Sequence, residues 1–161
     1  DAPVQAVNFN CPGQVVIAGE AGAVEKACGA LKEAGARRAV MLKVSAPFHS
    51  TLMEPAAKRL KEVLDTISIH DTLIPVFANV NAKEETKADE IRKNLVDQAA
   101  HAVHWEESVR NMIAGGVDCT VEVGPGTVLS GFMRKIDRSV TNLHAEDIDT
   151  INEVVSTLKG E

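Results

Sequence analysis

The stretch that decides the fold of the first part of the chain is VQAVNFNCPGQVVIA, residues 4–18. Residues 4–10 alternate in the manner of a strand, and residues 14–18 form a second run rich in β-branched side chains. Cys11, Pro12 and Gly13 lie between the two runs and are typical of a turn. The stretch therefore predicts a β-hairpin.

The residues after the hairpin extend this unit. Apolar residues recur at helical spacing over residues 21–35 and stop at Gly35, which suits a helix C-terminus. Residues 38–44 are then predicted to form a strand. The order strand, strand, helix, strand is half or more of a ferredoxin-like split unit, whose remaining elements would precede residue 1. The first residue is Asp1 and not Met, which suggests a processed or excised piece.

The pattern changes after Pro47. Thr51 and Glu54 match a capping box that would open a helix reaching Ile67, with Pro55 in its first turn. Further along, short strands alternate with helices and predict a parallel α/β layer. The expected strands are residues 75–80, 117–123 and 139–144; the expected helices are residues 88–98, 104–114, a segment from Thr127, and 146–158. Residues 81–87 are expected to be a charged turn.

Composition excludes several classes of function. The 161 residues carry a net charge of −6, which argues against binding to a phosphate backbone, so no nucleic-acid partner is expected. No apolar run approaches the roughly 18 residues of a membrane span, and no signal peptide is visible, so we expect a cytoplasmic protein without a membrane partner. The three cysteines contain no C-x-x-C pair and are interpreted as reduced.

His49 is the first candidate for chemistry, because it lies in a loop between a predicted strand and a predicted helix. Its imidazole could act as a general base, or it could be a structural histidine; Ser50 beside it is interpreted as a helix N-cap. The other candidates have weaker patterns. Gly124-Pro125-Gly126 is interpreted as a structural turn, and the pair His101-x-x-His104 does not predict a metal site. None of the seven serines lies in a G-x-S-x-G nucleophile elbow.

Several separated motifs together carry a family resemblance. The run NFNCPGQVVIAG, residues 8–19, resembles a segment of the malonyl-CoA:acyl carrier protein transacylases. Further matches follow in that family's order, namely SAPFHS at 45–50, VNA at 80–82, LVDQ at 95–98 before VHW at 103–105, and VEVGPG at 121–126. The resemblance covers essentially the whole chain and corresponds to the C-terminal portion of such an enzyme.

The resemblance implies an α/β fold, namely part of an α/β-hydrolase-like acyltransferase core with an inserted ferredoxin-like subdomain. Residues 1–44 would be the later part of the insertion, and residues 45–161 the returning part of the core. The family transfers a malonyl group from coenzyme A to the phosphopantetheine thiol of acyl carrier protein in fatty acid synthesis. The implied partners are malonyl-CoA, acyl carrier protein and the N-terminal portion of the same enzyme, with no cofactor and no metal.

The resemblance also implies roles for single residues. His49 matches the catalytic histidine, the general base for a nucleophilic serine, and Gln98 matches the glutamine whose backbone carbonyl orients that histidine. Asn8 and Asn10 fall in a segment near the substrate cleft. The serine, the oxyanion-hole glutamine and the carboxylate-binding arginine of the family would all precede residue 1. The chain alone is therefore expected to be incomplete and inactive.

Because acyl carrier proteins are acidic, a locally basic docking face is expected. We hypothesise that Arg37-Arg38 and Lys58-Arg59-Lys61, which flank the His49 loop in sequence, form part of it. Two other readings remain. The chain could come from an acyltransferase domain of a polyketide or fatty acid synthase, or it could be a non-catalytic ferredoxin-like binding module.

Overall fold

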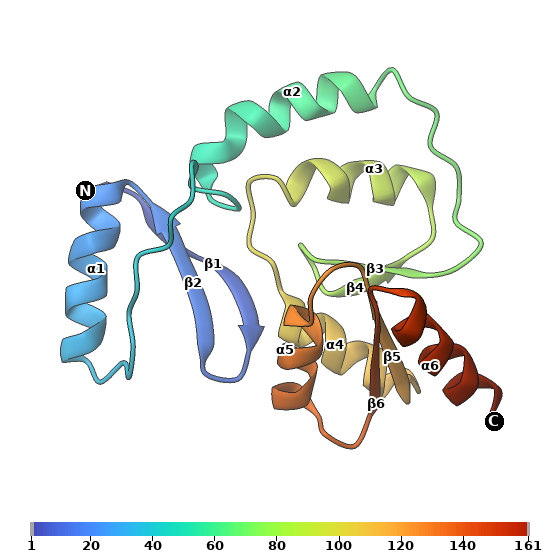
Figure 1. Cartoon of the computed structure of the whole chain (residues 1–161). Coiled ribbons are helices and arrows are strands. Elements are labelled where there is room, and N and C mark those ends of the chain that lie inside the picture. The colour runs from blue at the N-terminus through green and yellow to red at the C-terminus, as the bar shows by residue number, and fades with distance from the viewer. Residues whose placement is uncertain (1, 161) are drawn as a thin grey trace.

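The computed structural model describes residues 2–160 and has a mixed α/β fold. Its strands form three two-stranded sheets within the described residues, and helices lie between and beside them (Figure 1). The hairpin and one helix lie at one end of the molecule, and the C-terminal sheet and helix lie at the other. Two helices from the middle of the chain lie side by side along the top of this view.

The predicted hairpin is confirmed. Strand β1 (Val4–Cys11) pairs antiparallel with β2 (Gln14–Gly19), and the chain turns at Pro12 and Gly13. Gly13 has a φ of +77°, a left-handed conformation that a side chain would strain. The predicted helix is also confirmed as α1 (Ala21–Glu33).

The strand predicted over residues 38–44 is wrong. These residues form no strand, and no segment of residues 2–160 pairs with them. Their large apolar side chains are at least half exposed, from 51% at Met41 to 63% at Val44. A strand forms only where a second strand pairs with its backbone N–H and C=O groups. The apolar and β-branched side chains that suggested the strand do not provide that second strand.

The capping box predicted at Thr51 and Glu54 is also wrong. Residues Thr51–Met53 form a single 3-10 turn, η1, and the helix α2 (Glu54–Leu64) follows it and ends before Ile67. The Thr51 hydroxyl does not cap the helix, because it donates instead to Gln5 Oε1 at 3.0 Å, 46 residues away. Pro55 lies in the first turn of α2 as predicted.

The middle of the chain contains a hairpin where a charged turn was expected. Strand β3 (Val76–Ala78) pairs antiparallel with β4 (Lys83–Glu85). The prediction missed β4 because all three of its residues, KEE, are polar. Glu85 is nevertheless buried, and its carboxylate accepts a hydrogen bond from Asn94 Nδ2. Helices α3 (Ala88–Asp97) and α4 (Trp105–Ala114) follow close to their predicted bounds.

The last third contains the parallel pair that the alternating pattern predicts. Strand β5 (Cys119–Val123) pairs in parallel with β6 (Thr141–Ala145), joined by helix α5 (Val128–Ile136), and helix α6 (Ile148–Lys159) ends the described chain. A buried cluster joins this part to the hairpin, because it takes residues from β1, α4 and α5. Its members are Cys11, Val109, Met133, Ile136 and Val140. No helix within residues 2–160 has the length and apolar character needed to cross a bilayer.

Candidate active site

The structure brings His49 and Gln98 together. His49 ends the loop before η1, and Gln98 is the C-terminal cap of α3, so the two residues come from different elements. The ring nitrogen Nδ1 of His49 lies 2.8 Å from the backbone oxygen of Gln98, across 49 residues of sequence. Both side chains are half-buried.

This contact sets the tautomer of the neutral imidazole. A carbonyl oxygen has no proton to donate, so Nδ1 must carry the proton and donate it to Gln98 O. The lone pair is then on Nε2, which can accept a proton from a hydroxyl or thiol. A neutral carbonyl thus gives His49 the arrangement that a carboxylate gives the histidine of a Ser-His-Asp triad.

The backbone at His49 is strained. Its φ is +61°, and among residues 2–160 Ala82 is the other non-glycine residue with a positive φ. A left-handed conformation costs a side-chain-bearing residue roughly 1–2 kcal/mol, so it persists only where neighbouring contacts enforce it. Such strain is concentrated at functional sites.

Two side chains, Ser50 and Gln5, hold this loop in place by hydrogen bonds that the sequence did not predict. The Ser50 side chain is 1% exposed, and its hydroxyl donates to the backbone oxygen of Pro47 at 2.6 Å. Gln5 Oε1 accepts from the backbone N–H of Thr51 at 2.8 Å. Ser50 occupies the N-cap position of η1 without a capping bond, which corrects its interpretation as a side-chain cap. No sequence pattern points to Gln5, because its partner is distant in sequence.

Asn8 and Asn10 lie on β1, the strand that also carries Gln5. The backbone around Asn8 pairs with the segment after α3, with Phe9 N donating to Val103 O at 2.9 Å and Val103 N to Val7 O at 2.8 Å. The side chains of both asparagines are half-buried, and within residues 2–160 neither makes a hydrogen bond. They remain available to a ligand, but no hydrogen bond within residues 2–160 joins them to His49.

The remaining histidine candidates are separate from this site. His101 Nδ1 lies 2.7 Å from Asp97 O, whereas His104 stacks on Phe9 with ring centroids 5.4 Å apart. Across the described part of the chain, no three His, Cys, Asp or Glu side chains are grouped so that they could hold a metal ion.

The Gly124-Pro125-Gly126 turn uses its own N–H groups. Gly124 N donates to Ala145 O at 3.1 Å, and Gly126 N to Glu146 Oε2 at 2.6 Å, so neither is free for an anion. Two N–H groups in the first turn of α5 are also engaged, because Leu129 N and Ser130 N donate to the Glu122 carboxylate. Burial raises the pKa of the Glu122 carboxyl, but hydrogen bonds from Ser130 and Leu129 outweigh this and hold the pKa below its usual value.

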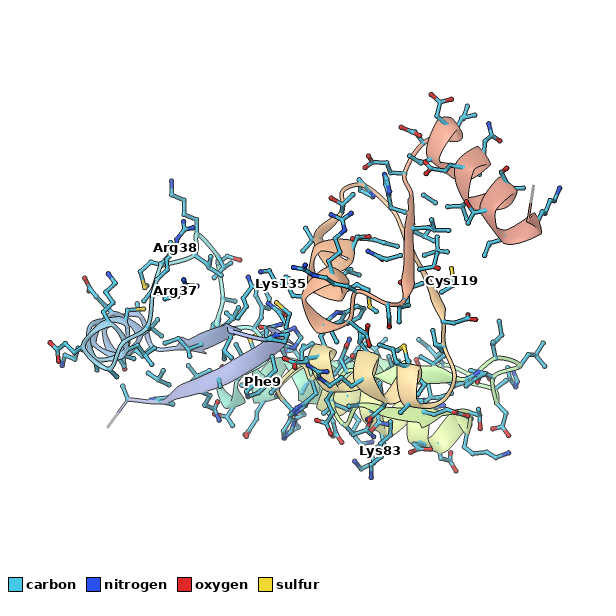
Figure 2. The ribbon with its side chains drawn as sticks, turned by 90° about the horizontal axis from the view of Figure 1, so that it is seen from below. Phe9, Arg37, Arg38, Lys83, Cys119 and Lys135 are labelled. Atoms are coloured by element: carbon cyan, nitrogen blue, oxygen red, sulfur yellow. The ribbon has the colours of Figure 1, made fainter. Side chains whose placement is uncertain are left out.

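The basic residues of the hypothesised docking face are not equivalent. Arg37 and Arg38 are exposed on the loop after α1 (Figure 2). Lys58 and Arg59 are exposed on α2 and form no ion pair within residues 2–160. Lys61 is already neutralised, since its Nζ lies 2.6 Å from Asp65 Oδ2.

Comparison with known proteins shows what this chain is similar to. It is 48% identical over 158 residues to the malonyl CoA-acyl carrier protein transacylase of Bacillus subtilis (strain 168), a match covering 98% of this chain and 50% of that protein. It is 49% identical over 138 residues to the transacylase of the same name from Escherichia coli (strain K12), covering 86% of this chain and 45% of that protein. The chain thus spans about half the length of the curated relatives it matches. No family profile matches it.

Solved structures agree with these sequence matches. The crystal structure of the malonyl CoA-acyl carrier protein transacylase from Clostridium perfringens superposes with a TM-score of 0.94 at 40% identity, over 99% of this chain and 50% of that one. A malonyl-transacylase solved in complex with a type II polyketide acyl carrier protein superposes with a TM-score of 0.93 at 42% identity, over 99% of this chain and 51% of that one.

Proposed function

Because this chain is a homologue of the malonyl CoA-acyl carrier protein transacylases, we propose that it forms part of an acyltransferase that moves a malonyl group from coenzyme A to acyl carrier protein in fatty acid synthesis. The observation that carries the proposal is the contact between His49 Nδ1 and Gln98 O, which leaves Nε2 ready to accept a proton. Malonyl-CoA is the substrate, and no further cofactor is needed for transfer between thiols.

The proposed reaction has two half-cycles. In the first, a serine hydroxyl attacks the thioester carbonyl while His49 Nε2 takes its proton; the C–S bond breaks, and His49 returns the proton to the departing coenzyme A thiolate. In the second, the phosphopantetheine thiol of acyl carrier protein gives its proton to His49 and attacks the malonyl-serine ester, and the serine oxygen recovers the proton as it leaves. Gln98 O holds Nδ1–H through both half-cycles.

We place the nucleophilic serine outside residues 1–161. None of the seven serines lies in a nucleophile elbow, and the Ser50 hydroxyl beside His49 is already bonded to Pro47 O. The relatives are about twice as long as this chain, so they have room for such a residue. The 161 residues alone should therefore accept no malonyl group.

The proposed architecture follows the same family. Residues 1–44 would belong to a ferredoxin-like subdomain and residues 45–161 to an α/β-hydrolase-like core. The exposed apolar side chains of residues 38–44 support this assignment, because a segment of that composition is suited to pairing within a larger sheet. The parallel β5–β6 pair with its crossover helix α5 supports the second part.

The proposed substrates meet the chain at different places. Asn8 and Asn10, whose side chains have no partner within residues 2–160, are the proposed contacts to the acyl-CoA. Arg37, Arg38, Lys58 and Arg59 are proposed to contact the acidic carrier protein. Lys61 adds little there because of its ion pair.

An acyltransferase domain of a polyketide or fatty acid synthase is the second candidate. It would use the same His49 arrangement, and one structural relative is a malonyl-transacylase in complex with a type II polyketide acyl carrier protein. The non-catalytic binding module has less support, because such a module has no need for a strained histidine with a preset tautomer.

The test uses this chain and a chimera in which it replaces the half of the Bacillus subtilis transacylase that it matches. After incubation with malonyl-CoA, the chimera should gain the mass of one malonyl group on a serine outside these residues, and the chain alone should gain none. His49→Ala should lower transfer by about 100-fold or more. His101→Ala is the matched control, because its ring nitrogen also contacts a backbone carbonyl. Stable acylation of the chain alone would refute the proposal.

A further inference from the structure

Helices α2 and α3 carry the two halves of the His49–Gln98 contact. His49 lies just before η1 and α2, whereas Gln98 caps the end of α3. The two helices lie side by side (Figure 1). The distance between His49 and the Gln98 carbonyl therefore depends on how α2 is held against α3.

Helix α3 is held firmly to the neighbouring hairpin. Asn94 is 5% exposed and donates through Nδ2 to the carboxylate of Glu85 on β4, which is 6% exposed. The start of the helix is fixed as well, because Ala88 N donates to Asp71 Oδ1 at 2.9 Å. Hydrogen bonds to a carboxylate are stronger than those between neutral groups. Helix α3 thus offers a fixed frame for the Gln98 carbonyl.

Helix α2 has few apolar contacts to hold it. Ala57 is its one buried residue within the described chain, and Val63 is 56% exposed. Within residues 2–160, packing alone therefore does little to set the position of α2. Its N-terminal side is held through Gln5 and Thr51, so its other end needs a separate attachment.

Arg92 of α3 supplies that attachment. Its Nη1 donates to Leu64 O, and its Nη2 donates to Ile67 O at 2.9 Å. Within residues 2–160 these are the hydrogen bonds that join a side chain of α3 to the end of α2. Leu64 is the last residue of α2, so its carbonyl lies at the negative end of the helix dipole, where a guanidinium is well suited to bind it. Ile67 lies in the turn after the helix, and its N–H also donates to Leu64 O, at 3.2 Å.

We propose that Arg92 is a positioning residue that clamps the C-terminal end of α2 onto α3 and thereby holds His49 Nδ1 against the Gln98 carbonyl. The effect of Arg92 on catalysis rests on the proposed function. Its effect on the tautomer of His49 does not, and can be measured separately. Arg92 lies six residues before Gln98 on α3, about 9 Å along the helix. It acts through the helix pair and does not contact a substrate.

The experiment measures the tautomer of His49 by nitrogen NMR of its ring in the 161-residue chain, under conditions where the imidazole is neutral. The His49→Gln variant, which lacks the ring, assigns the signal. In the unsubstituted chain the Nδ1–H form should dominate. Arg92→Met keeps the apolar stem but removes both donors. It should lower the ratio of Nδ1–H to Nε2–H about fivefold, the net contribution of one hydrogen bond, here that between His49 Nδ1 and Gln98 O.

Two further variants make the result decisive. Arg110→Met is the matched control, because the hydrogen bonds of the Arg110 guanidinium within residues 2–160 go to Glu106 of its own helix, and it should leave the ratio unchanged. Arg92→Lys keeps the positive charge but replaces the two guanidinium nitrogens, Nη1 and Nη2, by a single ammonium nitrogen, and it should lower the ratio about twofold. Circular dichroism and the melting temperature verify folding. If Arg92→Met fails to fold, the Lys variant decides, and a ratio equal to that of the unsubstituted chain would overturn the proposal.

A second readout separates this inference from the proposed function. In the chimera described above, Arg92→Met should lower kcat in proportion to the lost Nδ1–H fraction, by less than fivefold, and leave the KM for malonyl-CoA unchanged. A chimera without any transacylase activity would refute the proposed function, whereas the NMR measurement would still test the clamp. An unchanged tautomer ratio in folded Arg92→Met would refute the clamp even in an active chimera.

Discussion

Replacing His49 by alanine and by glycine tests whether the active-site loop stores backbone strain. Both substitutions remove the hydrogen bond to Gln98 O, so that loss cancels in their comparison. They differ in the Cβ atom, which a residue at φ +61° tolerates poorly. We therefore expect His49→Gly to be the more stable variant, the reverse of the usual order of these two residues.

The magnitude follows from two opposing effects. A left-handed conformation costs a residue with a Cβ atom about 1–2 kcal/mol. Glycine avoids this cost but loses about 0.5–1 kcal/mol more through its greater freedom in the unfolded chain. The net expectation is that His49→Gly has a free energy of unfolding about 0.75 kcal/mol above that of His49→Ala, the midpoint of the difference between the two ranges.

The assay is urea unfolding followed by the fluorescence of Trp105, the single tryptophan, which packs against the buried cluster. The slopes of the unfolding curves must agree for the free energies to be compared. The same pair of substitutions at His101, whose φ is not positive, is the control, and there alanine should be the more stable by about 0.4–1 kcal/mol. If alanine were the more stable substitution at both positions, the idea of backbone strain at His49 would be refuted.

Three further predictions concern other parts of the structure. Because the folded-state pKa of Glu122 is lowered, its contribution is present above the ordinary carboxyl range and is lost as pH falls through the folded pKa; Glu122→Gln should cost about 1–2 kcal/mol near neutral pH and less in acid, measured by urea unfolding at both. Ser50→Ala should lower the free energy of unfolding by about 1–2 kcal/mol in urea unfolding, because it removes a buried donor to Pro47 O. A thiol reagent should modify Cys11, which is 2% exposed, more slowly than Cys119; equal rates would contradict its burial.

Local patterns predicted much of the secondary structure. The hairpin at residues 4–18, α1, α3, α4 and the β5–α5–β6 unit all follow from periodicity and from the turn residues between them. These elements obtain their hydrogen bonds from residues near in sequence, so a local pattern contains most of the needed information. The parallel pairing of β5 with β6 followed from the helix between them.

The failures share a physical cause. Residues 38–44 have the composition of a strand, but a strand forms only where another strand pairs with it. Thr51 matches a capping box, yet its hydroxyl binds Gln5 in the hairpin. The polar strand β4 was missed because the burial of Glu85 depends on Asn94, nine residues further along the chain.

The candidate site also combines features that follow from the local sequence with features that depend on contacts distant in sequence. From its residues alone, the chain's sequence determined that His49 lies in a loop beside a helix and that a histidine there could act as a base. Gln98, which orients His49, could not be found in the same way. It acts through its backbone carbonyl, a group that every residue has, so no side-chain pattern indicates it. Only the family resemblance pointed to Gln98. The tertiary structure decided the 2.8 Å contact, the left-handed backbone of His49 and the attachment of α2 by Arg92. Each of these joins residues distant in sequence or depends on such contacts, and only the folded chain brings those partners within hydrogen-bond reach.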